Sequence, residues 1–290
     1  MPRWGCALAL LLSLSTPSAF AEGDGGDGGD GAEASQDDGG ANKMAGVAAH
    51  EASLGDKKLK AGDTKGAMVH YGKALKMHSS PDIMIKRATG YMVSGKTEKA
   101  RKDLDAALGL DPKNLKGLLK RARVHRSLGL FDLAVADYEA VKAIEPANAK
   151  AAKELPMVSQ ARNAQKIGRT SFEKAQEARG KGDAAGAKRL YKEAHYNLGN
   201  ALKAAPDAPD SLEMDARCLI ELGLYADAIQ TTGRLLKVKP SSLEGFLLRG
   251  RAYLFEGEQD VAMQHFKEGY KSDPCASTSA SAEHGLWLAG

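Results

Sequence analysis

Histidines, cysteines and paired acids are the residues that most often carry out catalysis or hold metals, and this sequence does not place them at the spacing that either chemistry needs. The seven histidines are His50, His70, His78, His125, His195, His265 and His284. They form no metal-ligand spacing, and none shares a helix face with a cysteine. No glycine-rich phosphate loop follows a strand pattern. We therefore expect a protein that is not an enzyme and that carries no cofactor or metal.

A second class of residue, suited to packing, recurs at a fixed interval. Each copy has a glycine, an alanine five residues later, a bulky residue four after that and often a proline eight further on. Gly95 and Gly129 begin two copies 34 residues apart, Gly223 and Gly257 begin two more at the same interval, and a further two begin at Gly62 and Gly182. A period of 34 residues is typical of the tetratricopeptide repeat (TPR).

The chemistry of these positions explains the spacing. The glycine suits a tight turn between two antiparallel helices, and the alanine suits the point where the helices touch. The bulky residue lies one turn further along the same face, and the proline begins the next helix. Aromatic residues make up only 6% of the chain, which suits stacked units that bury their apolar faces on one another. We therefore predict an all-α fold, a TPR solenoid of about six repeats.

Repeat four departs from this interval. The spacing from Ala187 to Ala228 is 41 residues, seven more than the period of 34. Because seven residues are close to two helical turns, we expect one lengthened helix over 189–204. Its extra turns would project as an edge feature or as a contact.

The chain divides into six segments by composition and repeat phase. We predict a signal peptide (1–21), an acidic glycine-rich disordered segment (22–47), TPR repeats 1–3 (48–148), a connecting helix between two subdomains (149–170), TPR repeats 4–6 (171–274) and a low-complexity tail (275–290). The signal peptide is predicted from a basic start, an apolar run over 7–14 and small residues before a cleavage after Ala21. This segment predicts entry into the secretory pathway, and no later stretch is apolar enough to span a membrane.

The charge distribution favours neither a nucleic-acid site nor a calcium site. The formal net charge is +4, although residues 22–41 hold seven acids and no base. The lysines and arginines are spread over many helices without interleaved aromatics, so we expect solvated helix faces rather than a nucleic-acid site. A calcium site in the acidic tract is disfavoured because the EF-hand glutamate is missing.

Cys218 and Cys275 could pair, but Cys218 fits better as a small buried apolar residue.

The best candidates for function lie on the first helix of each repeat. Stacked TPR units curve so that these helices line a concave groove, and in the TPR register positions 2, 5, 9, 12 and 13 of the helix face it. The predicted polypeptide-binding residues of repeats 1–3 are Leu59, Ile85, Thr89, Met92, Leu119, Arg123 and Arg126. Exposed apolar residues in a groove mark a polypeptide-binding surface. If the register is wrong by one position, several of them are instead interhelix core.

One known TPR binding mode is disfavoured. TPRs that hold the acidic tails of cytosolic heat-shock chaperones use lysine and asparagine on this helix. The corresponding positions here are Ala52 and Asp56. A carboxylate at Asp56 would repel an acidic tail.

The sequence resembles the endoplasmic-reticulum TPR co-chaperones of the DnaJ type, subfamily C, also called inhibitor-of-kinase proteins. The likeness is carried by the segments 54–62, 86–89, 95–100, 137–141 and 222–229. It implies a lumenal protein that holds unfolded or misfolded clients in the groove and passes them to the resident chaperone BiP. It also implies a link to the unfolded-protein response and to inhibition of stress kinases. Family members add a J domain with a His-Pro-Asp motif, which this sequence lacks, so we expect client binding without stimulation of BiP.

A different function remains open. The same solenoid would serve as a scaffold that holds one folded partner in a secretory or periplasmic assembly. The two functions differ in whether the groove prefers an unfolded chain or a native protein.

Overall fold

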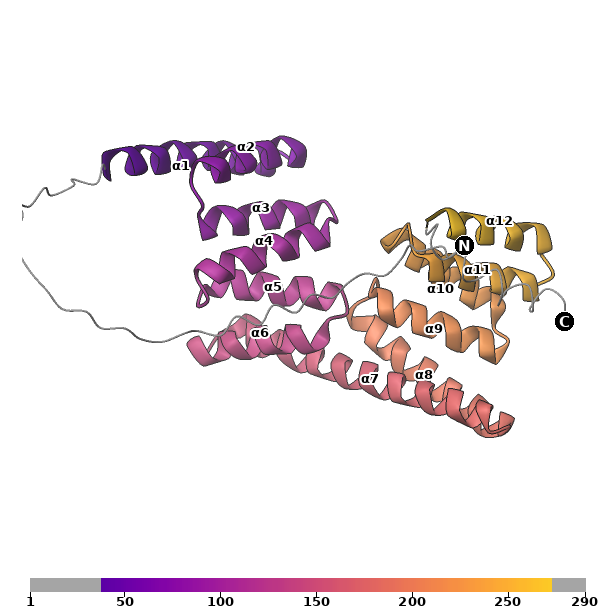
Figure 1. Ribbon diagram of the computed structural model, residues 1–290. Helices are drawn as coiled ribbons and strands as arrows, with labels where there is room; N and C mark the ends of the chain where they lie inside the picture. Colours follow the sequence, from indigo (N-terminus) through magenta and orange to yellow (C-terminus); the bar gives the residue numbers. More distant parts are fainter. Residues whose placement is uncertain (1–37, 273–290) are drawn as a thin grey trace, which may run out of the picture. The chain divides into compact units, whose positions relative to one another are not determined.

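Twelve helices make up the part of the chain that the structure, a computed structural model, describes, which is residues 38–272 (Figure 1). Side chains are described from Lys43 onward. The helices are α1 (Asp38–Lys60), α2 (Thr64–Met77), α3 (Pro81–Val93), α4 (Thr97–Leu110), α5 (Leu115–Ser127), α6 (Phe131–Ile144), α7 (Ala149–Gly180), α8 (Ala184–Ala204), α9 (Pro209–Leu222), α10 (Tyr225–Val238), α11 (Leu243–Phe255) and α12 (Gln259–Ser272). No strand occurs within these bounds, and the predicted all-α TPR fold is confirmed.

Successive helices form six antiparallel pairs, each joined by the predicted turn. The six turn glycines all have a positive φ, between 70° and 90°, a conformation that other residues adopt only with strain. At Gly129 a second constraint applies, because a Cβ there would lie 2.6 Å from the Cβ of Ala208. The loop after α5 therefore lies directly against the start of α9.

The alanines and bulky residues of the repeat lie where the sequence places them. Ala100, Ala134 and Ala262 are all at most 1% exposed. In the first pair, the ring of Tyr71 packs so closely on Gly55 that a Cβ at that glycine would lie 2.7 Å from it. A small residue on the first helix thus accepts a large one from the second, as ridges-into-grooves packing requires.

Helix α7 differs from the predicted connection. The segment 149–170 is not a separate connecting helix, because it continues without a break to Gly180. One apolar core cluster also extends from Leu108 in α4 through α7 to Leu235 in α10, so the core shows no boundary between two subdomains. The lengthened helix of repeat four is α8, with 21 residues where the neighbouring helices α6 and α10 have 14.

The first helix begins earlier than expected. Disorder was predicted through residue 47, but α1 begins at Asp38. The run from Ala41 to Ala49 contains four alanines, the strongest helix formers, and Ala48 is fully buried against α2. The predicted signal peptide, the acidic stretch 22–37 and residues 273–290 lie outside the described residues. Within 38–272, no helix combines the length and hydropathy that crossing a membrane would require.

Candidate polypeptide-binding face

The first helices of the pairs line the concave side of the helix layer. Four contacts join these helices in sequence, α3 with α5, α5 with α7, α7 with α9, and α9 with α11. Within the described residues, no two second helices lie in comparable contact. The first helices are therefore closer together, and the layer curves toward them. We call their exposed side the inner face.

Ile85 corrects the predicted set of groove residues. Its side chain is 5% exposed and belongs to the core between α3, α4 and α5. A Cβ at Gly117 of α5 would lie 3.4 Å from the Cδ1 of Ile85, so this side chain fills the space between neighbouring first helices. It is interhelix core, the outcome that the alternative register allowed for.

The other apolar residues of the predicted set are half-buried. Leu59, Met92 and Leu119 each pack against the edge of a core cluster. The hydroxyl of Thr89 donates to the Ile85 carbonyl oxygen at 2.8 Å, within its own helix. These four side chains border the inner face, and none of them stands free of the core.

Arg123 and Arg126 are held by Glu154, which the sequence analysis did not nominate. The Nη2 of Arg123 lies 2.6 Å from Oε1 of Glu154, and Nη1 of Arg126 lies 3.6 Å from Oε2. The hydroxyl of Tyr138 also donates to this carboxylate. The hydrogen bonds that Arg123 donates to Glu154 raise the pKa of Arg123 above its ordinary value. Glu154 was missed because it falls in the segment taken as a connection, and no repeat landmark marks it.

Next to this cluster, the inner face is basic. Burial lowers the pKa of Lys120, and the neighbouring charges of Arg123, Lys150 and Lys116 lower it further. Like charges so close together disfavour one another's protonated forms. Repeat 3 therefore presents more positive charge to the inner face than Glu154 balances.

Asp56, at one of the two positions that correspond to the tail-binding lysine and asparagine, already has polar partners. It accepts hydrogen bonds from the hydroxyl of Tyr71 and from Nζ of Lys86, each at 2.7 Å. Ala52, at the second position, is 3% exposed and has no polar group to offer. Both positions serve packing between the first two repeats.

Two hollows that were not predicted from the sequence lie on the inner face of repeats 4–6. Their volumes are about 430 Å³ and 300 Å³, and Phe172 and Arg217 line both. The ring of Phe172 meets Tyr191 edge to face at 5.8 Å between centroids. The same TPR register, extended to repeats 4–6, would have named Phe172, Gln176 and Arg217.

Arginine–glutamate pairs surround the aromatic floor of these hollows. Arg179 lies 2.5 Å from Glu221, and Arg217 lies 3.0 Å from both Glu213 and Glu244. The pairs join α7, α9 and α11 across the inner face. A hollow with an apolar floor and donors and acceptors at its rim is suited to hold a side chain together with the backbone beside it.

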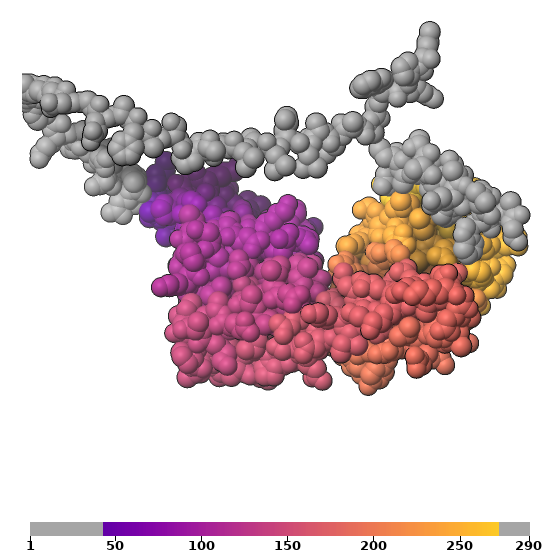
Figure 2. All heavy atoms as spheres, turned by 60° about the horizontal axis from the view of Figure 1, so that its bottom comes forward, coloured from indigo at the N-terminus to yellow at the C-terminus, as the bar shows by residue number. Residues whose placement is uncertain are grey.

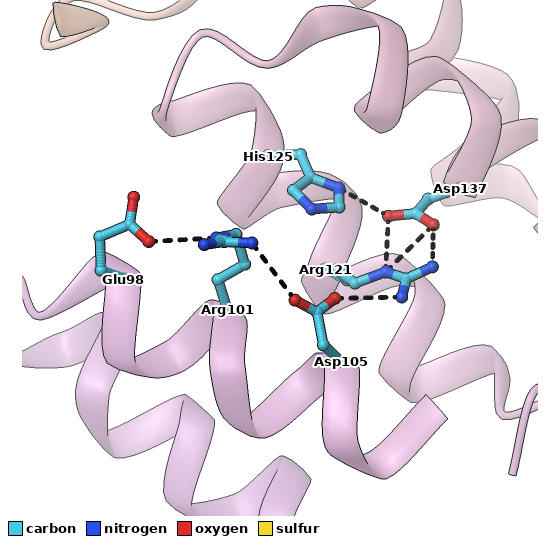
Figure 3. Close-up of polar contacts among 6 residues, drawn as sticks. All are labelled: Glu98, Arg101, Asp105, Arg121, His125 and Asp137. Carbon is cyan, nitrogen blue, oxygen red and sulfur yellow. Dashed lines mark hydrogen bonds and ion pairs between the residues drawn. The ribbon is translucent and has the colours of Figure 1, made fainter. Parts of the chain in front are cut away.

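A polar network between α4, α5 and α6 has a structural role (Figure 3). Arg121 lies between Asp105 at 3.2 Å and Asp137 at 2.7 Å, and Nδ1 of His125 lies 3.0 Å from Asp137. Burial alone would raise the pKa of Asp137, but hydrogen bonds from His125 and Arg121 outweigh it and lower the pKa below its ordinary value. His125 is 4% exposed, so its ring is part of the packing between α5 and α6.

Cys218 is likewise internal. It is fully buried in the core formed by α7, α8 and α9, and this burial raises the pKa of its thiol. Its interpretation as a small buried apolar residue is confirmed. Cys275 lies outside the described residues, so the pairing of the two cysteines stays an open question.

Comparison with known proteins agrees with this architecture. A family model described as tetratricopeptide repeat matches residues 85–149 and 172–237. The rice (Oryza sativa subsp. japonica) DnaJ protein P58IPK homolog B is 29% identical over 208 residues, 72% of this chain and 41% of the relative. The Arabidopsis thaliana DnaJ protein P58IPK homolog is 27% identical over 203 residues, 70% of this chain and 39% of the relative. The chain thus spans about two fifths of the length of these relatives.

A solved structure shows the same fold. The crystal structure of the P58(IPK) TPR domain matches with a TM-score of 0.53 and 19% identity, over 78% of this chain and 61% of that one. At this identity the match concerns the fold alone. The chain therefore has the TPR fold, and in sequence it is similar to the plant DnaJ P58IPK homologues.

Proposed function

We propose that this protein is a co-chaperone, a binding protein rather than an enzyme, that holds unfolded or misfolded polypeptides on its inner face. Relatives named as DnaJ proteins support the class, and the chain is also 25% identical over 238 residues to the Arabidopsis Hsp70-Hsp90 organizing protein 3. The observation that carries the proposal is the pair of hollows over Phe172. Their rims of paired charges provide hydrogen-bonding groups for a polypeptide backbone, and their floor takes an apolar side chain.

The finer proposal places this activity in the lumen of the endoplasmic reticulum. There the protein would pass its clients to BiP, act in the unfolded-protein response and share the kinase inhibition implied by the resemblance. For these residues the proposal is client binding on the inner face. The alternative is a scaffold for one folded partner.

Filling the hollow tests the binding site. Gln176 lines the larger hollow, so Gln176→Trp should weaken binding of a denatured reporter by about tenfold, because the indole occupies the space that the client needs. Fluorescence anisotropy with the labelled denatured reporter measures this, and slower aggregation of that reporter is the matching functional readout. Gln230 is exposed on α10, outside the inner face, and Gln230→Trp is the matched control.

The reporter's folding state separates the two functions. Tighter binding of the denatured form than of the native form supports the co-chaperone, whereas equal indifference to both favours the scaffold. If Gln176→Trp and Gln230→Trp behave alike, the hollow is not the client site.

Glycosylation tests the compartment. The sequence contains no Asn-x-Ser/Thr acceptor, so Met44→Thr would create its only one, at Asn42. Expressed in eukaryotic cells, this variant should gain an endoglycosidase-sensitive increase in mass, and the unaltered chain should not. An unmodified variant that stays in the cytosolic fraction would contradict the lumenal proposal.

A further inference from the structure

The extra turns of repeat four create a surface that the inner face does not use. Helices α7 and α8 run side by side (Figure 1), and between them lies a hollow of about 520 Å³. Three large apolar side chains line it, Met157 at 42% exposure, Ile167 at 47% and Tyr196 at 69%. We call the surface formed by the residues that line this hollow the outer α7–α8 face. Parts of α7 and α8 are visible on the space-filling surface in Figure 2.

Charge is almost absent from the outer α7–α8 face. Among the residues that line its hollow, only Lys203 is charged, and its Nζ donates to Oδ1 of Asn200 at 2.9 Å. The other polar lining residues are amides, among them Gln160 and Asn163. By contrast, 27% of the whole chain is charged, and the inner-face hollows carry arginines and glutamates. A highly charged partner would therefore gain little on this face.

This pattern favours a second copy of the chain. Seven acids of the chain fall in 22–38, so the remaining residues carry a net positive charge, and two copies repel each other over most of their surface. In a two-fold contact, each patch meets itself. Amides both donate and accept hydrogen bonds, so they can pair with their own kind where lysines and arginines cannot.

We propose that the outer α7–α8 face binds the same face of a second copy. The two pairs of long helices would then form a four-helix bundle, a packing that buries apolar side chains between antiparallel helices. Met157, Ile167 and Tyr196 would supply the apolar centre, with Gln160, Asn163 and Asn200 around it. The additional turns of α8 lengthen this contact without altering the inner face.

Sedimentation velocity of the full chain tests the proposal. The wild-type protein should form a dimer of about 61 kDa, twice the 30.6 kDa of one chain, at tens of micromolar concentration. Tyr196→Glu and Tyr196→Lys should each weaken the dimer by about tenfold or more, because a charge would be buried unpaired at its centre. Val93 is 68% exposed on α3, so Val93→Glu is the control and should leave the dimer intact.

Mixing the two Tyr196 variants gives a second readout. Opposite charges then face each other, and association should recover in the mixture although neither variant dimerises alone. Helicity from circular dichroism identifies any variant that fails to fold, and Ile167→Glu with Ile167→Lys is the replacement pair. Three results would overturn the proposal: a wild-type chain that stays monomeric, a dimer that these substitutions do not weaken, and a mixture in which association does not recover. The first result is also the one expected if a different protein binds this face.

Discussion

Replacing Asp137 with alanine is expected to lower the free energy of unfolding by about 3 kcal/mol. The Asp137 side chain is 6% exposed and accepts hydrogen bonds from Arg121 and His125. Its removal leaves the buried His125 ring without that partner and Arg121 with only Asp105. Equilibrium urea unfolding followed by circular dichroism measures the loss.

The same carboxylate predicts a loss of stability in acid. Because the pKa of Asp137 in the folded chain lies below its ordinary value of 3.8, folding favours the ionised form. Its contribution is therefore present above about pH 4 and disappears as the pH falls through the folded pKa. Asp137→Asn should flatten this part of the stability profile between about pH 5 and 2.

A surface acid gives the control. Asp132 lies on the same helix, and its side chain is 89% exposed in a 3.9 Å pair with Arg162. Surface pairs contribute little, so Asp132→Ala should change the stability by less than about 0.5 kcal/mol. If the two alanine variants were equally stable, the network in Figure 3 would not stabilise α5 against α6.

Much of the fold could be predicted because the repeat constrains backbone and packing together. A turn with positive φ requires glycine, and the close approach of two helices requires alanine, so residues such as Gly95 and Ala100 appear at a fixed interval. Helix ends carry a weaker signal. The extension of α1 to Asp38 and the continuity of α7 through residue 170 depend on helix propensity and on neighbours far along the chain, which the period does not encode.

The binding face was harder to predict than the fold. The position of a residue in the repeat determines the direction in which its side chain leaves the helix. The exposure of that side chain depends in addition on how close the next pair of helices lies. Gly117 brings α5 close to α3, and Ile85 fills the gap. Glu154 and the hollows over Phe172 involve several helices at once, so their roles follow only from the packed structure.

Because Ile85 is buried between helices, replacing it is expected to lower the stability of the fold strongly. Ile85→Asp should lower the free energy of unfolding by about 4 kcal/mol or more, because it removes apolar packing and buries a carboxylate without a partner. The substitution should lower the urea midpoint and reduce helicity at 37 °C, and any loss of client binding would follow from unfolding.

Two further substitutions, Val93→Asp and Ile85→Val, show whether unfolding or a damaged binding site causes a loss of client binding. Val93→Asp places the same charge at a 68% exposed site on the same helix, where the change in stability should stay within about 0.5 kcal/mol. Ile85→Val removes one methylene group and should cost about 1 kcal/mol while client binding is retained. The contrary result would be an Ile85→Asp protein that is stable and fully helical but does not bind a denatured client. Ile85 would then be a groove residue, and α3 and α5 would lie further apart than the contact between Ile85 and Gly117 indicates.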